Sequence, residues 1–203
     1  MKLLATTMFI ASASYAMATT VIVTNNRGPT ATREIVNSSA TLVAGFGAFG
    51  TLTESGIQGV STTFSGLNFK QFGLGGGGVT TSTSGQFSFT GDVGPAAPNA
   101  ADFLTKNIYL VVGFGGANLA SSTELFIYRF NQTFGDLNSP TPITQTLTAA
   151  GSEGVTLFGT EIGNPQTTAS GRFAASAITP IPEPSAALLG ALGALGLLRR
   201  RRI

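Results

Sequence analysis

The sequence contains no cysteine, no histidine and no tryptophan. The lack of cysteine excludes disulfides and thiolate chemistry, and the lack of histidine excludes a Ser-His-Asp triad and any imidazole metal ligand. Charged residues make up only 10% of the chain, against about 25% in an average globular domain. Glycine and phenylalanine are abundant, with 27 and 15 residues among 203, and threonine and serine are common. This composition favours β structure.

The net charge of +2 is a property of the chain ends. Four arginines occupy positions 199–202 and Lys2 stands near the N-terminus, whereas residues 19–180 have six basic and eight acidic side chains, a net charge of −2. Those residues contain no basic patch with interleaved aromatic side chains. We therefore expect no nucleic-acid partner.

The N-terminus has the layout of a secretory signal peptide. Lys2 precedes a short apolar run, and small residues follow that end in an A-x-A pattern at Ala16 and Ala18. This order predicts export and cleavage after Ala18, so that residues 1–18 form a signal helix that is removed. The alternative interpretation is a buried N-terminal helix or strand.

The C-terminus combines three features in order. They are Pro182, Glu183 and Pro184, then 14 uncharged residues at 185–198, then Arg199, Arg200, Arg201 and Arg202. A helix over the uncharged run would be about 21 Å long, shorter than a bilayer core of about 30 Å. Thinning of the bilayer and snorkelling of the arginines make up part of the difference. The positive-inside rule keeps the arginines cytoplasmic and places the preceding residues outside.

This tail, residues 181–203, resembles the sorting signal of the PEP-CTERM family. The resemblance implies that an exosortase, a membrane cysteine protease or transpeptidase, recognises Pro182, Glu183 and Pro184 and processes the tail. It also implies a Gram-negative bacterium that makes exopolysaccharide. The protein would contact the membrane transiently and then remain at the cell surface or outside the cell. A plain tail anchor is the alternative.

Short apolar stretches separated by turn residues recur through the body, residues 19–180. Phe87 and Phe89 alternate with polar residues, as in a half-buried strand, and the continuous apolar run at 108–112 indicates a central strand. We expect strands at 20–24, 41–44, 59–64, 67–72, 86–90, 107–114, 124–130, 143–148 and 155–158, and one helical turn within 98–104. The pattern predicts a mainly β fold, a single β-sandwich or jelly-roll-like domain between the signal helix and a short C-terminal transmembrane helix.

Residues 45–50 fit the G-x-G-x-x-G pattern of dinucleotide-binding sites. Such a site needs a helix that opens at the glycines, but residues 51–56 are too short and too glycine-broken to form one. We interpret the segment as a glycine-bent strand and expect no cofactor. Gly73, Gly75 and Gly78 fit the same formula by chance within a glycine-rich run.

Few side chains are candidates for catalysis or metal binding. Glu153 and Glu161 are a potential carboxylate pair of the kind that glycoside hydrolysis requires. Asp92, Asp102 and Asp136 are potential calcium ligands, but no alternating Asp/Asn loop supports such a site. We interpret these acids as solvated surface groups and expect neither a catalytic residue nor a metal site.

These features predict a non-enzymatic exported β-domain with a structural or adhesive role in the envelope or extracellular matrix. The first alternative is a carbohydrate-binding module for the cell's exopolysaccharide, and an exposed aromatic platform beside Asn or Asp would indicate it. The second is a glycoside-active enzyme, and two inward-facing carboxylates about 5–9.5 Å apart in a cleft would indicate that. Asn37 and Asn131 begin formal glycosylation sequons, which we interpret as incidental.

Overall fold

The computed structural model describes residues 18–25, 34–73, 79–81, 87–147, 153–163 and 172–178. Within these ranges the chain forms β-strands and single turns of 3-10 helix, so the prediction of a mainly β fold is confirmed. No helix in the described ranges is long and apolar enough to cross a membrane. The expected signal helix and C-terminal transmembrane helix lie outside the described residues.

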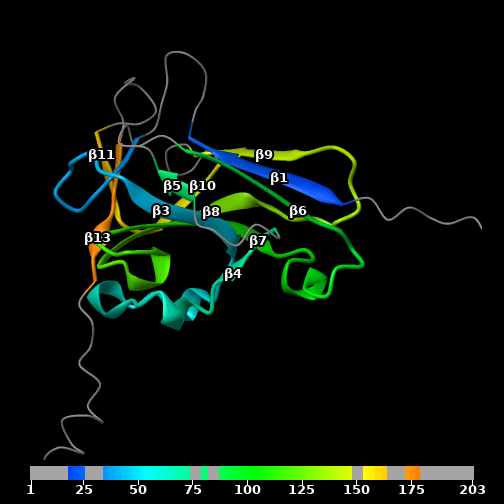
Figure 1. Ribbon diagram of the computed structural model, residues 1–203, viewed down its shortest axis with the longest axis horizontal. Helices are drawn as coiled ribbons and strands as arrows, with labels where there is room; N and C mark the ends of the chain where they lie inside the picture. The colour runs from blue at the N-terminus through cyan, green and yellow to red at the C-terminus, as the bar shows by residue number, and fades with distance from the viewer. Residues whose placement is uncertain are drawn as a thin grey trace, which may run out of the picture.

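The largest sheet has seven strands in the described residues, in the order β10-β8-β7-β3-β4, with β5 also pairing with β3 and β13 with β8 (Figure 1). The bounds are β3 Gly45–Thr51, β4 Lys70–Gln71, β5 Val79–Thr81, β7 Asn107–Phe114, β8 Glu124–Thr133, β10 Gly154–Phe158 and β13 Ser176–Ala177. Antiparallel β7 and β8 form its centre, with Val111 opposite Ile127. The apolar run at 108–112 is therefore in a central strand, as predicted.

Two smaller sheets accompany this central sheet in the described residues. One has the order β6-β1-β9, and the other the order β11-β12-β2. Their bounds are β1 Thr19–Thr24, β2 Glu34–Val36, β6 Ser88–Val93, β9 Ile143–Thr146, β11 Thr160–Ile162 and β12 Arg172–Ala174. Strand β1 runs antiparallel to β6 and parallel to β9. Figure 1 shows β1, β6 and β9 lying over one face of the central sheet.

The main hydrophobic core lies between the central sheet and the β6-β1-β9 sheet. From β1 and β6 come Val21, Val23 and Phe89, and from the central strand comes a row that includes Leu110 and Val112, all at most 3% exposed. Alternate residues of a strand point to opposite faces, so only every second residue of β7 belongs to this core. The shared apolar layer holds the two sheets face to face.

A second apolar cluster covers the opposite face of the central sheet. Val111 and Ile127 point into it, and Leu67 packs against them from a segment rich in 3-10 turns. The 3-10 turns of the chain's described part are η1 Glu54–Gly56, η2 Gly59–Ser61, η3 Ser65–Leu67, η4 Ala100–Asp102 and η5 Leu119–Ser121. Because both faces of β7 and of the first half of β8 are covered, residues 108–112 and 125–128 are continuously buried rather than alternating.

Six expected strands are present: β7 with the expected bounds, and β1, β6, β8, β9 and β10 with shifted ends; η4 lies within the expected helical turn. The expected strand at 41–44 is wrong, since pairing begins only at Gly45. The strand at 59–64 is also wrong. There Gly59 adopts a left-handed φ of 60°, and Thr62 Oγ1 accepts the Gln58 N–H, which closes a turn.

The expected strand at 67–72 is reduced to the two residues of β4. Asn68 has a φ of 48°, a left-handed conformation that ends η3 and delays the extended backbone. The strands that the sequence did not indicate are β2, β5, β11, β12 and β13, each of two or three residues. Such short strands depend on their pairing partners more than on a local apolar pattern.

Candidate functional site

Of the residues predicted to direct export and sorting, the structure describes Ala18 alone. Ala18 is exposed and directly precedes β1, whereas Thr19 is fully buried and its Oγ1 accepts the Ser139 N–H at 3.1 Å. The others lie outside the described residues: Ala16, Pro182, Glu183, Pro184, Arg199, Arg200, Arg201 and Arg202. The predicted cleavage point therefore falls at the start of the first strand.

The glycine-rich pattern at 45–50 forms strand β3, as we interpreted it, and η1 rather than an α-helix follows. A Cβ at Gly47 would lie 2.4 Å from Phe89 Cζ, and one at Gly50 would lie 1.9 Å from the Lys70 carbonyl oxygen. The first glycine admits a ring from the opposite sheet, and the second admits the backbone of β4. These glycines thus serve packing within the fold.

Glu153 and Glu161 are not brought together. Thr156 Oγ1 donates a hydrogen bond to Glu161 Oε1 at 3.0 Å, which holds this carboxylate near the middle of β10. Glu153 stands three residues before Thr156, about 10 Å away at 3.3 Å per residue. Glu153 lies in the bend before β10, whereas Thr156 lies within the strand. The arrangement differs from two carboxylates that face each other across a cleft.

The three aspartates considered as calcium ligands are also apart. Asp92 in β6 accepts a hydrogen bond from Thr20 Oγ1, and Asp102 ends η4. Asp136 accepts the backbone N–H of Asn138 at 3.1 Å, within a loop. In the described part of the chain, no three side chains of the types His, Cys, Asp and Glu are grouped so that they could hold a metal ion.

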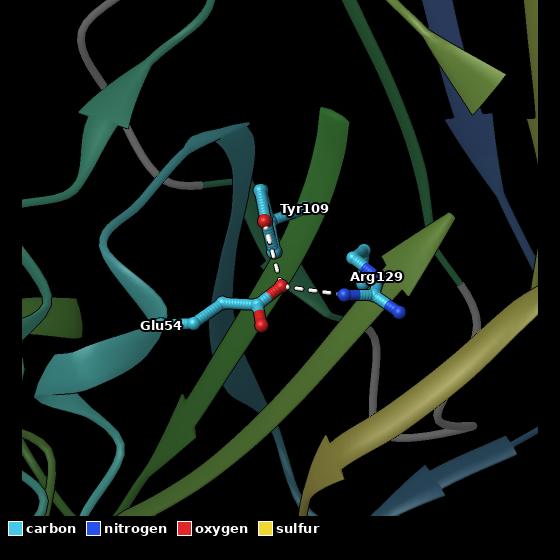
Figure 2. Close-up of polar contacts among 3 residues, drawn as sticks. All are labelled: Glu54, Tyr109 and Arg129. Carbon is cyan, nitrogen blue, oxygen red and sulfur yellow. Dashed lines mark hydrogen bonds and ion pairs between the residues drawn. The ribbon is translucent and has the colours of Figure 1, made fainter. Parts of the chain in front are cut away.

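One polar cluster joins the 3-10 segment to the central sheet. Tyr109 and Arg129 are directly opposite each other on β7 and β8. Figure 2 shows both side chains converging on Glu54 of η1, where Tyr109 Oη and Arg129 Nη1 each donate to Glu54 Oε1 at 2.8 Å. The cluster therefore ties η1 to the outer face of the sheet.

Ionisation in this cluster follows from its contacts. Burial opposes the charge of Glu54, but the hydrogen bonds from Tyr109 and Arg129 and the charge of Arg129 outweigh it and hold the pKa of this carboxyl below its usual value. Burial and the hydrogen bond to Glu54 raise the pKa of the Tyr109 phenol. The Arg129 and Glu54 side chains are 35% and 42% exposed, and such ion pairs contribute about 0–1 kcal/mol. We interpret the cluster as a structural latch.

A groove of about 520 Å³ lies at one edge of the molecule, between the sheets. Its lining residues are Asn131 and Gln132 of β8, Thr144, Gln145 and Thr146 of β9, and Glu153 just before β10. Strand β9 ends the order of the smaller sheet and β10 ends the order of the central sheet. The volume is within the range of about 300–1,000 Å³ for ligand pockets.

Gln145 is the unusual residue of this groove. It lies between Ile143 and Leu147 in the row of β9 side chains that faces the main core, yet it is polar and only 6% exposed. Its Nε2 donates to Gln132 Oε1 and to the Thr144 carbonyl oxygen. Within the described residues no donor reaches Gln145 Oε1. A buried amide with an unpaired carbonyl costs about 1–3 kcal/mol.

The rest of the groove is polar and fixed by backbone pairing. The Asn131 N–H donates to the Glu153 carbonyl oxygen at 2.8 Å, and Thr144 lies opposite Ile22 in the parallel ladder. Among the described residues, none of those that line the groove is positively charged, and no donor reaches the Glu153 carboxylate. The groove therefore offers amides, hydroxyls and one carboxylate to a ligand that donates hydrogen bonds.

The lining residues of this groove come from three separate segments of the chain, and the sequence patterns did not predict that they meet. From the sequence, Asn131 was noted only as the first residue of a formal sequon, and Glu153 only as a potential carboxylate partner of Glu161. One local signal was available. In the row at 143, 145 and 147, Gln145 takes a place that the alternating pattern assigns to an apolar residue.

Comparison of the chain with protein-family models, with curated proteins and with solved structures gives no match. No function is therefore transferred from a relative.

Proposed function

We propose that this chain is an exported envelope or extracellular-matrix protein that an exosortase sorts through its C-terminal tail. The observation behind the proposal is the order of three sequence features: the Pro-Glu-Pro triplet at 182–184, the uncharged run at 185–198 and the arginines at 199–202. Each is weak alone, but together at the C-terminus they resemble the PEP-CTERM signal. The leader at 1–18 supports the same route.

The geometry of the tail suggests separate roles for the Pro-Glu-Pro triplet, the apolar helix and the arginines. The arginines hold one end of the apolar helix at the cytoplasmic face, and a helix of about 21 Å brings the Pro-Glu-Pro triplet close to the opposite face. Proline keeps the triplet extended, a shape that suits a protease groove. Glu183 is then a recognition contact, whereas the helix and the arginines present it.

For the body we propose a β-sandwich or jelly-roll-like domain with a structural or adhesive role and no catalytic activity. The apolar layer shared by the central sheet and the β6-β1-β9 sheet supports the sandwich form. The absence of histidine and cysteine from the sequence supports a non-enzymatic role, since both imidazole and thiolate chemistry are removed.

Carbohydrate binding is the second candidate for the body. The aromatic platform that would indicate it is not seen in the described residues, where Phe46, Phe64 and Phe69 are half-buried against the second apolar cluster. The observation that favours this candidate is instead the polar groove beside β9. The two-carboxylate enzyme loses support from the separation of Glu153 and Glu161.

The substitution Glu183→Ala tests the sorting proposal. If the carboxylate is recognised, its loss leaves donors of the enzyme unpaired and costs about 1–3 kcal/mol, roughly a 5- to 150-fold loss in recognition. We expect the variant to stay membrane-bound with an intact tail, while the wild-type protein is cleaved. Intact mass spectrometry of membrane and released fractions from the native host measures both ends of the chain.

Asp102→Ala is the matched control, because it removes one exposed carboxylate from the body with the same change in net charge. We expect it to be processed like the wild-type protein. A plain anchor needs only apolarity and positive charge, so it would tolerate Glu183→Ala. If Glu183→Ala and wild-type protein show the same masses and the same distribution, Glu183 belongs to no recognised signal.

A further inference from the structure

We propose that the groove between β8, β9 and β10 binds an uncharged, hydroxyl-rich chain, that is, a stretch of neutral polysaccharide. The inference deepens the adhesive role proposed for the body and rests on it. It names the site and the chemical class of the ligand, and it is independent of how the tail is processed.

The buried amide of Gln145 has an acceptor that lacks a donor in the described residues. This amide faces inward in a row otherwise filled by Ile143 and Leu147, and it is 6% exposed. Its NH₂ group is committed to Gln132 and to the Thr144 carbonyl oxygen, while no donor in the described residues reaches its Oε1. Buried polar groups are normally paired. A ligand hydroxyl that enters the groove supplies the missing donor.

The charge of the groove lining favours a neutral ligand. Glu153 places a carboxylate in the groove, and none of the described lining residues is basic. An anionic ligand would bring like charge to this carboxylate without a compensating cation. A hydroxyl donates a hydrogen bond to the carboxylate at no such cost, so a neutral donor-rich ligand fits better.

The polar groups of the groove resemble sugar hydroxyls in their hydrogen bonding, and the strands that bear them hold them in place. Asn131, Thr144 and Thr146 add an amide and two hydroxyls, groups that both donate and accept as sugar hydroxyls do. The strands that bear them are paired on at least one side, so the polar groups are held in place before a ligand arrives. With no exposed aromatic ring in the described residues, recognition depends on hydrogen bonds and is weak for a single groove.

The test is saturation-transfer NMR on full-chain protein in a zwitterionic detergent without a sugar headgroup. The probes are neutral hexasaccharides of glucose, mannose or galactose, a uronic-acid hexasaccharide as the anionic probe, and a glucosamine hexasaccharide as the cationic one. We expect saturable binding of a neutral probe. We expect Asn131→Ala and Thr144→Val each to weaken it about two- to tenfold, as the loss of one hydrogen bond predicts.

Thr90→Val is the matched control. Thr90 and Thr144 lie on either side of Ile22 in the same sheet and are both exposed, but only Thr144 lines the groove. We expect Thr90→Val to bind like the wild-type protein. Gln145→Met tests the buried acceptor directly, and its fold is checked by thermal unfolding. If it does not fold, the variants at the exposed Asn131 and Thr144 still decide the question.

Three outcomes would overturn the proposal: no neutral probe binds, the neutral probes bind equally to the wild type, Thr144→Val and Asn131→Ala, or charged probes alone bind. Binding of the glucosamine probe that disappears in Glu153→Gln would identify an amine site instead. Failure here with normal processing of the tail would leave the sorting proposal standing, because the two experiments measure different parts of the chain.

Discussion

Gly47→Ala tests whether the glycine pattern of β3 serves packing between the sheets. A Cβ at this position would lie 2.4 Å from Phe89 Cζ and 2.8 Å from its Cε2. Carbon atoms in contact are normally about 3.5–4.0 Å apart, so the ring or the strand must move by about 1 Å. Phe89 is 3% exposed and stacks on Phe87 at 4.7 Å between ring centroids, which leaves it little room.

Overpacking of this kind costs about 1–3 kcal/mol. For a domain of this size, each kcal/mol lowers the unfolding temperature by about 2–4 °C, so we expect a loss of about 2–12 °C. The measurement is thermal unfolding of full-chain protein followed by circular dichroism. Gly94→Ala is the matched control, because its nearest atoms would be at 3.8 Å, an ordinary contact, and its φ is not left-handed.

Phe89→Leu completes a double-mutant cycle with Gly47→Ala. Replacing the ring by the smaller leucine side chain makes room for the new methyl group. The double variant should therefore lose less stability than the sum of the losses in the two single variants. Residues in contact show coupling of about 0.5–3 kcal/mol. If Gly47→Ala unfolds at the wild-type temperature, or if the two changes are additive, the glycine is not required for the contact between the sheets.

Two further predictions concern the latch and the leader. The pKa of Glu54 is lowered by folding, so its contribution to stability is present above the unfolded pKa, near 4.5, and is lost as the pH falls through the lower folded pKa. Urea unfolding between about pH 6 and pH 3 should therefore show a smaller loss of stability in Glu54→Gln than in the wild-type protein; parallel losses would contradict this role for the carboxylate. For the leader, the small residues at Ala16 and Ala18 predict a mature chain that begins at Thr19. N-terminal sequencing of protein from the native host measures this, and a chain that still begins at Met1 would refute it.

Much of the strand content followed from local sequence patterns. Strands β1, β7, β8 and β10 were expected close to their observed bounds because each has an apolar run or a two-residue period that is independent of its partners. The interpretation of residues 45–50 as a strand was also correct, since they form β3 and the single 3-10 turn η1 follows in place of an α-helix. The order of leader, body and tail stays a prediction from the sequence alone, which rests on local charge, apolar length and small residues.

Tertiary structure decided what depends on contacts between distant segments. The segment at 59–64 has strand-like residues, but a left-handed Gly59 and the Thr62 hydroxyl close a turn, and residues 59–61 form a 3-10 helix. Glu153 and Glu161 are near in sequence, yet a hydrogen bond from Thr156 holds the Glu161 carboxylate beside β10, three residues beyond Glu153. Asn131, Gln145 and Glu153 line one groove only because the β9 edge of the smaller sheet lies beside the β10 edge of the central sheet. Local sequence patterns do not predict how two sheets pack together.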